Sequence, residues 1–438
     1  MFALALLALS SPGAGQQLAF PGAEGAGRFA LGGRGGQVLF VTNLEDSGPG
    51  SLRAAIETKG PRTILFRVSG TIKLAKPLVI REGRVTIAGQ SAPGDGVTLR
   101  DHMLQISADD VVIRYIRSRL GDESKTESDA VTVTKGRRII LDHVSASWSV
   151  DETLSASARY SESGQGFYDL TVQWSIISES LTHSLHAKGD HGYGSLIRGG
   201  GGARISFHHN LWANHSARMP RPGNYDGPDL DPVGAFFDFR SNVFYNWGGT
   251  RSGYNADKAT LAQYNFVDNA YVAGPQSTRP IAFDESNVLA KAWFAGNSMN
   301  GVIPADPWSL VTGVSPEGYR LAAPVEVAPV ASDPAASAYE RVLASAGASR
   351  PRDVVDARVV SGVRDRTGRQ IDSQRDVGSW PALASLPAPR DGDDDGIPDA
   401  WERKHGLDPN VADGNRDKNR DGYTNLEAWL AAVADGRG

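Results

Sequence analysis

The sequence predicts an all-β fold in which the chain winds as a parallel β-helix, or solenoid. Short β-rich stretches begin roughly 20 to 35 residues apart and are joined by polar or Gly-rich connectors. No amphipathic helical pattern of useful length separates them, which argues against alternating strands and helices. Asn pairs four residues apart also recur, at 210/214, 242/246 and 265/269. A side chain repeated at a fixed offset is expected where successive coils stack in register.

The predicted strands alternate apolar and polar residues. In one of them Ile205, Phe207 and His209 share a face, and stretch 139–143 repeats this pattern, so His143 is expected to point inward and Asp142 outward. Both are expected to be structural. The strand count alone also permits a β-sandwich. The predicted strands are 63–68, 84–88, 111–116, 139–144, 170–177, 205–212 and 236–247.

The chain is expected to begin with a secretory leader. Residues 1–17 contain an apolar run followed by small residues, as in the second half of a signal peptide. The basic region that usually precedes the run is missing, so either the start lies upstream or the signal is atypical. The alternative is a buried N-terminal segment. We predict that the protein is secreted.

Three further regions follow the leader. The β-helix is assigned to residues 18–320, and residues 321–390 form an extension and linker. The extension contains a predicted helix at 333–343, with Asp333 as its N-cap and Pro334 at the first helical position. Residues 350–390 give no clear pattern. A small module is assigned to residues 391–430.

Composition excludes several kinds of site and partner. The 438 residues include no Cys, which removes disulfides, thiol nucleophiles and Cys-ligated zinc. The formal charge is −5, but residues 391–438 carry 12 acidic and 6 basic side chains, so the remainder is nearly neutral. A nearly neutral body gives no electrostatic reason to bind nucleic acid. No apolar run is long enough to span a bilayer.

The C-terminal module has the spacing of a calcium loop. Asp391, Asp393 and Asp395 alternate, Gly396 follows at position six, and Glu402 occupies position twelve, as in an EF-hand. Calcium requires converging oxygen ligands, and the Gly permits the sharp bend between them. The alternative is a solvated acidic linker.

A second loop begins 26 residues after the first. It offers Asp417, Asn419 and Asp421, and its acid falls one place early, at Glu427. The two loops together resemble the calcium-dependent dockerin-like and thrombospondin type 3-like modules of secreted enzymes. That resemblance implies a role in folding or in attachment to another protein or the cell surface.

Signatures of common hydrolytic sites are missing from the sequence. Six of the nine His fall between residues 183 and 215, but no HExxH, GxSxG or P-loop pattern occurs. The adjacent His208 and His209 cannot both bind one ion from a regular strand, because neighbouring side chains point to opposite faces.

Several stretches occur in a characteristic order: 66–72 (FRVSGTI), 85–90 (VTIAGQ), 140–145 (ILDHVS), 208–210 (HHN) and 218–221 (RMPR). Together they are similar to the pectate lyases of polysaccharide lyase family 1, and the resemblance covers roughly residues 20–300. It implies a right-handed parallel β-helix that cleaves polygalacturonate by β-elimination with Ca²⁺ as cofactor.

The resemblance also implies roles for three basic residues. Arg218 corresponds to the base that removes the C5 proton, although a free guanidinium has a pKa above about 12. Arg221 and Lys188 correspond to residues that bind the substrate carboxylates. The segment before Lys188 departs from the family pattern.

The implied calcium ligands are partly altered. Asp129 and Asp151 match the family's first two calcium aspartates. Where a further acid is usual, this chain has Ser155. Glu152 is the residue that would replace the missing ligand.

We therefore expect a secreted, monomeric, calcium-dependent lyase acting on polygalacturonate or a related uronan. Two alternatives remain open. One is a β-helix glycoside hydrolase of the polygalacturonase type, in which acids such as Asp151 and Glu152 would work with water. The other is a non-catalytic β-helix that binds polyuronate.

Overall fold

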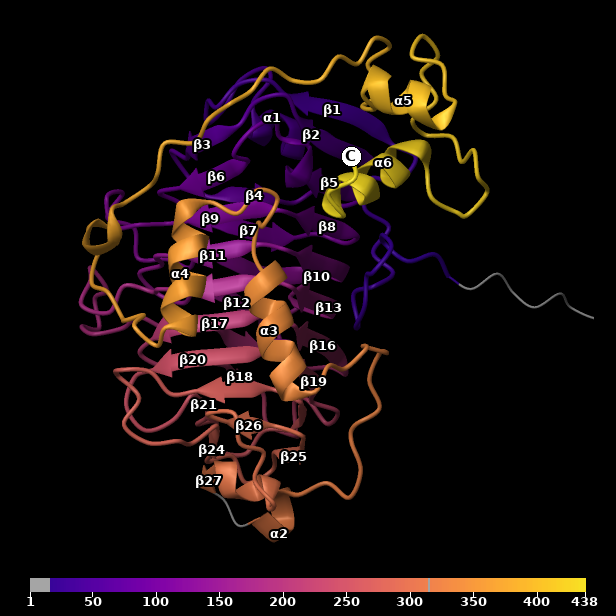
Figure 1. The fold of residues 1–438 in the computed structure, drawn as a ribbon. Helices are drawn as coiled ribbons and strands as arrows, with labels where there is room; N and C mark the ends of the chain where they lie inside the picture. Colours follow the sequence, from indigo (N-terminus) through magenta and orange to yellow (C-terminus); the bar gives the residue numbers. More distant parts are fainter. Residues whose placement is uncertain (1–15, 314–315) are drawn as a thin grey trace, which may run out of the picture.

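The chain winds into a solenoid of stacked coils (Figure 1). A computed structural model describes residues 16–313 and 316–438; the predicted leader lies outside these ranges except for its last two residues. The ladders between the strands are parallel, as the sequence predicted, and the β-sandwich is excluded. Each coil contributes strands to up to three faces.

The first face carries the longest line of strands. It consists of β1 (Gln37–Val41), β2 (Arg62–Phe66), β5 (Val85–Ala88), β8 (Val111–Arg114), β10 (Val131–Asp142), β13 (Gly166–Gln173), β16 (Ala203–His208), β19 (Ala235–Arg240), β22 (Ala262–Val267) and β25 (Lys291–Ala295).

The second face is a separate nine-stranded sheet. It consists of β3 (Gly70–Lys73), β6 (Val97–Arg100), β9 (Ile116–Arg119), β11 (Ser145–Ser147), β14 (Ile176–Ser178), β17 (Leu211–His215), β20 (Val243–Trp247), β23 (Ala270–Val272) and β26 (Ser298–Met299).

The third face is built from very short strands. They are β4 (Leu78–Ile80), β7 (Leu104–Ser107), the first part of β10, β12 (Leu154–Ser157), β15 (Leu196–Arg198) and β18 (Arg221–Gly223), and then β21 (Gly253–Asn255), β24 (Phe283–Glu285) and β27 (Val311–Gly313).

β10 bends from the third face onto the first. Its residue Val131 pairs with Leu154 of β12, whereas Ile139 pairs with Leu170 of β13. Gly136 lies at the bend with a φ of 123°, and a Cβ there would come within 2.0 Å of the Ala108 carbonyl oxygen. The bend therefore requires Gly.

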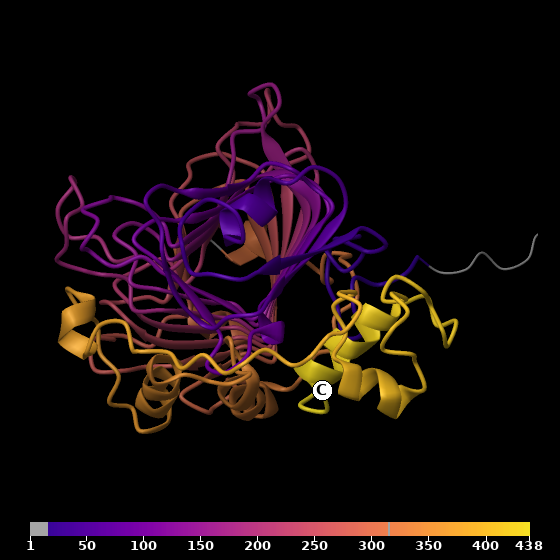
Figure 2. The same cartoon turned by 90° about the horizontal axis from the view of Figure 1, so that it is seen from above.

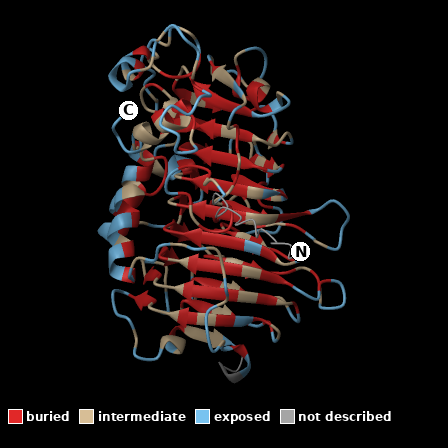
Figure 3. Ribbon diagram, turned by 90° about the vertical axis from the view of Figure 1, so that its right-hand side faces the viewer, coloured by how far each residue is buried: buried red, intermediate tan, exposed pale blue. Residues whose placement is uncertain are grey.

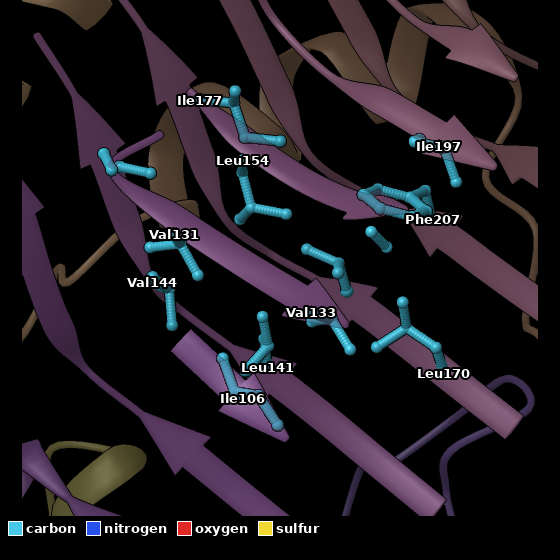
Figure 4. Packing of buried hydrophobic residues seen from close by; sticks show 14 of the residues in the cluster. Ile106, Val131, Val133, Leu141, Val144, Leu154, Leu170, Ile177, Ile197 and Phe207 are labelled. Atoms are coloured by element: carbon cyan, nitrogen blue, oxygen red, sulfur yellow. The ribbon is translucent and has the colours of Figure 1, made fainter. Parts of the chain in front are cut away.

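The core is made of columns of like residues. Ile139, Leu170, Ile205, Phe237 and Tyr264 occupy equivalent positions on five successive coils, and all are buried. Figure 4 shows such side chains, with those of neighbouring coils packed against one another. Burial follows the strands, while exposed residues gather in the loops (Figure 3). Each coil thus supplies the apolar surface that the next one buries.

An Asn ladder runs along one corner, as the repeat predicted. The Oδ1 atom of Asn242 accepts from the backbone N–H of Asn210 at 2.9 Å, and Asn242 donates likewise to Asn269. Asn297 continues the ladder. Asn265 does not take part, because its side chain binds the backbone of Val325 instead.

The prediction that His143 points inward is wrong, and the geometry of this corner explains why. β10 ends at Asp142, and His143 has a φ of 54°, so the strand alternation stops before it. Its ring stacks on Tyr115 of the preceding coil, with centroids 4.6 Å apart, and its side chain is 16% exposed. Trp174 and His209 hold the same corner position on the next two coils, also with positive φ.

Two helices cover the second face: α3 (Ala335–Ser345) and α4 (Val354–Arg364) (Figures 1 and 2). Val342 and Val359 pack with Leu211 and Val243 of the sheet. The helix predicted at 333–343 is therefore confirmed, but it begins two residues later, with Pro334 as its N-cap. α4 lies in the stretch that gave no sequence pattern.

The remaining helices lie toward the ends of the solenoid. They are α1 (Leu52–Glu57), α2 (Pro316–Tyr319), α5 (Asp399–His405) and α6 (Asn425–Ala434). α6 packs Leu426 and Trp429 against Leu65 of β2 and Ala88 of β5, so the C-terminal segment is docked on the first coils. Among the described residues, no helix has the length and apolar character needed to cross a membrane.

The ladder gives a stability prediction. Asn242→Ala should lower the free energy of unfolding by about 2–4 kcal/mol, because buried groups on both neighbouring coils lose hydrogen bonds to the Asn242 side chain. Urea denaturation would measure the change. Gln263→Ala is the control, since Gln263 is a half-buried amide of β22 whose side chain makes no hydrogen bond within the described residues. Equal effects of the two changes would contradict the ladder's role.

Glu285 of β24 gives a pH prediction. Burial raises its pKa to about 8, and Oε2 has no partner within the described residues. A raised pKa stabilises the fold at low pH, and this contribution is lost as pH rises from about 4.5 toward 8. The free energy of unfolding, measured by denaturation at saturating calcium, should therefore fall less between pH 5 and pH 8 in Glu285→Gln than in wild type. The difference between the two proteins should be on the order of 1 kcal/mol or more. The exposed Glu162→Gln should behave as wild type; a slope unchanged in Glu285→Gln would refute the assignment.

Candidate active site

Successive coils bring the predicted site residues together where the third-face strands begin. Asp129 lies just before β10, Asp151 and Glu152 lie before β12, and Arg218 lies before β18. Backbone bridges link Glu152 to Tyr193 and Tyr193 to Ala217, so these coils are in direct register. Residues almost ninety positions apart thus share one small region.

Three carboxylates form the centre of this region. Asp129, Asp151 and Glu152 each offer an oxygen atom within 4.8 Å of the others. Burial, and then the neighbouring Asp151 carboxylate, raise the pKa of Asp129 to about 8. Side chains of this kind fit a hard divalent cation such as calcium, which would relieve the repulsion between them.

Ser155, which stands where the resemblance would place an acid, is buried on β12 and brings no carboxylate to this group, although its hydroxyl opposes the rise in the pKa of Asp129. Its Oγ accepts a hydrogen bond from the backbone N–H of Leu196 at 3.2 Å. Glu152 therefore supplies the third carboxylate from a different position in the chain.

Two His residues hold Asp151 from the adjacent loop. Nε2 of His191 lies 2.7 Å from Asp151 Oδ1, and Nε2 of His186 lies 3.2 Å from Glu127. The two imidazole rings stack with centroids 3.6 Å apart. Burial, followed by the charge of His191, lowers the pKa of His186. The only sequence signal for these residues was the density of His between 183 and 215.

Arg218 lies between the carboxylates and two Tyr rings. Its guanidinium forms an ion pair with Glu152 and lies over the ring of Tyr193, with Cζ 4.2 Å from the centroid. Nε is 3.5 Å from the hydroxyl of Tyr254. The residue has a φ of 60°, which turns its side chain away from the path of the next strand.

A row of arginines continues along the third face. Arg221 begins β18 and lies over Tyr254, and burial lowers its pKa. Arg198 of β15 pairs with Asp257 and lies over Tyr225. The sequence gave no signal for Arg198, because only the stacking of β15 on β18 places it beside Arg221.

Lys188 lies on the same loop as His186 and His191. It is exposed, its backbone N–H donates to His186 Nδ1, and its charge contributes to the lowered pKa of His186. No direct contact with Arg218 or Arg221 is made within the described residues.

The first C-terminal loop brings its acids together. Asp391, Asp393 and Asp395 form one group of converging oxygens, and Asp395, Glu402 and Asp413 form another. Glu402 is fully buried, and neither of its carboxylate oxygens has a hydrogen-bond partner within the described residues. Unpartnered buried oxygens are the expected mark of a cation site. Asp413, eleven residues beyond Glu402, was missed by the sequence spacing.

The second loop is arranged differently. Asp417 and Asp421 bind backbone or side-chain groups of their own loop, which includes Asn419. Glu427 does not join them: it caps the start of α6 and accepts from Arg34 Nε at 2.8 and 2.9 Å. The loop and its predicted acid therefore do not converge.

Known proteins resemble this chain along almost its whole length. No protein-family model matches it. It is 36% identical over 427 residues to "Probable pectate lyase C" of Aspergillus fumigatus, covering 95% of this chain and 94% of that protein. The solved structure of jun a 1, the major cedar pollen allergen, covers 74% of this chain and 92% of its own, with a TM-score of 0.55 and 16% identity. A solved pectate lyase covers 77% and 99%, with a TM-score of 0.53 and 15% identity.

Proposed function

The chain belongs to the pectate lyases, and from this membership we propose that it is a secreted, calcium-dependent enzyme that cleaves polygalacturonate by β-elimination. The single observation that carries the proposal is the meeting of Asp129, Asp151 and Glu152 with Arg218 across three coils. Secretion is supported by the nature of the substrate, because a polymer of charged sugars does not cross a membrane. We propose that the enzyme acts as a monomer.

The reaction requires loss of a weakly acidic proton. The hydrogen on C5 of a uronate is α to the carboxylate, and its removal places further negative charge on a group that is already an anion. A bound calcium ion supplies neutralisation of that carboxylate. The protein must then hold the ion, orient the sugar and accept the proton.

Three side chains are proposed to hold the ion: Asp129, Asp151 and Glu152. His191 fixes the direction of Asp151 through its 2.7 Å contact, leaving the other carboxylate oxygen free to face the groove. The stacked His186 is held by Glu127 and keeps His191 in place.

Arg218 is proposed to accept the C5 proton. An ion pair with Glu152 stabilises the charged guanidinium, so Glu152 must turn from Arg218 before that step. Glu152 thus has two alternative partners, the cation and the arginine. The ring of Tyr193 keeps the guanidinium plane in position during the exchange.

Arg221 and Lys188 are proposed to bind substrate carboxylates, with Arg198 as an addition from the structure. The Nε atoms of Arg221 and Arg198 are buried without a hydrogen-bond partner within the described residues. Guanidinium groups suit this task because two parallel N–H donors match one carboxylate.

A hydrolase of the polygalacturonase type is less well supported. Its paired acids would have to be free on either side of the scissile bond. Here Asp151 contacts His191 and Glu152 contacts Arg218, and both lie in the same acid group. Product chemistry separates a lyase from a hydrolase. Retention of the polymer without any change in its size would indicate a non-catalytic binder.

For the C-terminal module, residues 391–430, we propose one structural calcium site made by Asp391, Asp393, Asp395, Glu402 and Asp413. The module follows the extension, residues 321–390, and its helix α6 packs on the first coils of the body, residues 18–320. An ion that holds the loop together would therefore fasten the module to the body. Asp391 is itself paired with Arg67, which follows β2. A folding role is therefore favoured over attachment. Asp417, Asn419, Asp421 and Glu427 are not proposed as a second site, because Glu427 pairs with Arg34 and caps α6 instead.

Removal of Arg218 tests the catalytic assignment. Arg218→Ala should lower lyase turnover by a factor of at least about 10³ while leaving the fold intact, because general-base catalysis supplies a factor of this order. Ultraviolet absorbance of the unsaturated product measures turnover. Arg137→Ala, at an exposed arginine of β10, is the control. Full activity without Arg218, or new reducing ends without absorbance, would remove the proposed mechanism.

Glu402 tests the structural site. Calcium should raise the unfolding temperature of the wild type, and Glu402→Gln should reduce that rise while increasing the stability of the calcium-free protein, since it removes a buried carboxylate. Differential scanning calorimetry with and without chelator measures both effects. Asp408→Asn, an exposed acid outside the groups, is the control. A calcium response unchanged in Glu402→Gln would exclude the site.

A further inference from the structure

A cavity lies away from the candidate active site, at the corner of the solenoid where the first face turns into the second. Its volume is about 550 Å³, within the range of small-molecule sites. Segments distant in the sequence enclose it: residues 20–22, the ends of β8, β10 and β13, the last part of α3, and the end of α6. None of the proposed catalytic or calcium-binding residues lines it.

The cavity carries an excess of positive charge. Arg114, Arg341, Arg350 and Arg437 line it, against the carboxylates of Asp142 and Asp435. Arg437 is paired with Asp435, and Arg341 is paired with Asp333, so the excess is carried mainly by Arg350. Its exposed surface is mainly polar.

The acid on its floor is already neutralised by the protein. Asp142 accepts from Arg114 Nε at 2.7 Å and from Gln173 Nε2 at 2.8 Å, and His143 Nδ1 lies 3.0 Å away. Asp142 therefore positions Arg114 and does not repel a ligand anion.

Arg114 has donors left for a ligand. Its hydrogen bond to a protein side chain within the described residues uses Nε. The guanidinium lies over the ring of Phe20, with Cζ 3.8 Å from the centroid, and the residue is 7% exposed. A buried, aromatic-backed guanidinium at a cavity wall is a rigid anion-binding group.

The aromatic column at this corner favours an anion as well. Tyr115, His143 and Trp174 stack on one another with interplanar angles of 11°, so their faces are covered and their edges remain for contact. Ring edges carry the positive part of the aromatic quadrupole. Arg341, which is paired with Asp333, lies over the ring of Trp174.

We propose that this cavity is a non-catalytic binding site for a short oligouronate, a ligand that combines carboxylates with many hydroxyl groups. The hydroxyl of Ser345 and the ring of His143 would serve the sugar hydroxyls, and the arginines would serve the carboxylates. The choice of a sugar acid rests on the proposed function, because oligouronates are the products of that reaction. The anion site itself depends only on the cavity.

The test counts binding sites with trigalacturonate. Isothermal titration uses the Arg218→Ala protein, so that no turnover occurs, in the presence of calcium. Two sites are expected, and adding Arg341→Ala with Arg350→Ala should leave one or weaken the second at least tenfold. Arg364→Ala with Arg369→Ala is the control: it makes the same charge change at exposed arginines that do not line the cavity.

A local probe shows where the ligand binds. The indole N–H resonance of Trp174, assigned by its loss in Trp174→Phe, should shift on adding trigalacturonate and should not shift with the fully methyl-esterified trisaccharide. A protein that keeps Arg218 and carries both Arg341→Ala and Arg350→Ala should retain lyase activity on trigalacturonate. This activity would show that the variant is folded.

Several outcomes would overturn the proposal. They are a single site in every variant, an unmoved Trp174 resonance, or equal binding of the methyl ester. Inorganic phosphate that shifts the resonance with the same affinity would reduce the cavity to a general anion site. Binding is measured without turnover, so the binding results can be interpreted even if the protein proves not to be a lyase. Two binding sites without any lyase activity would reject the proposed function and leave the cavity proposal standing.

Discussion

The structure depends on the register of backbone hydrogen bonds between one coil and the next. Parallel pairing places equivalent residues of neighbouring coils beside each other, as in the column from Ile139 to Tyr264. Apolar residues gain from this repetition because each buries the next. Polar residues can be repeated inside only when they satisfy one another, and an amide, which both donates and accepts, does so in the Asn ladder.

The same register creates a conflict where carboxylates meet. Asp129 and Asp151 come from adjacent coils, and burial, followed by their proximity, raises the pKa of Asp129. The repulsion between such acids can be relieved by a cation, by an arginine or by an imidazole. This site provides for all three. The acids could share an ion, Glu152 contacts Arg218, and Asp151 contacts His191. A charged cluster of this kind is thus held together by the neutralisation of charges that the fold forces into one place.

Much of the fold could be predicted from the sequence, because most first-face strands are apolar and the Asn repeat has a fixed offset. Of the second face, only β14 and β20 fell wholly or largely within predicted ranges, and a polar strand such as β11 (Ser-Ala-Ser) was missed. The third-face strands were missed: β15 and β18 have three residues each, too few for a recognisable pattern. Arg218, a site residue with a motif, lies in one region with the acids. His186, His191 and Arg198 were not foreseen, since their roles arise only from contacts between coils. Asp413 was missed because it lies beyond the loop spacing.

The docking of the last helix on the first coils has a consequence for biogenesis. A solenoid can in principle add coils in the order of synthesis, since each needs only its predecessor. In this protein the surface around Leu65 and Ala88 is covered by Leu426, Leu430 and Trp429, which are translated long after it. The earliest coils must therefore wait, with apolar surface uncovered, until α6 has been made. A nascent chain in this condition is a natural client for chaperones, and a stop codon before α6 would release a protein with that surface permanently open.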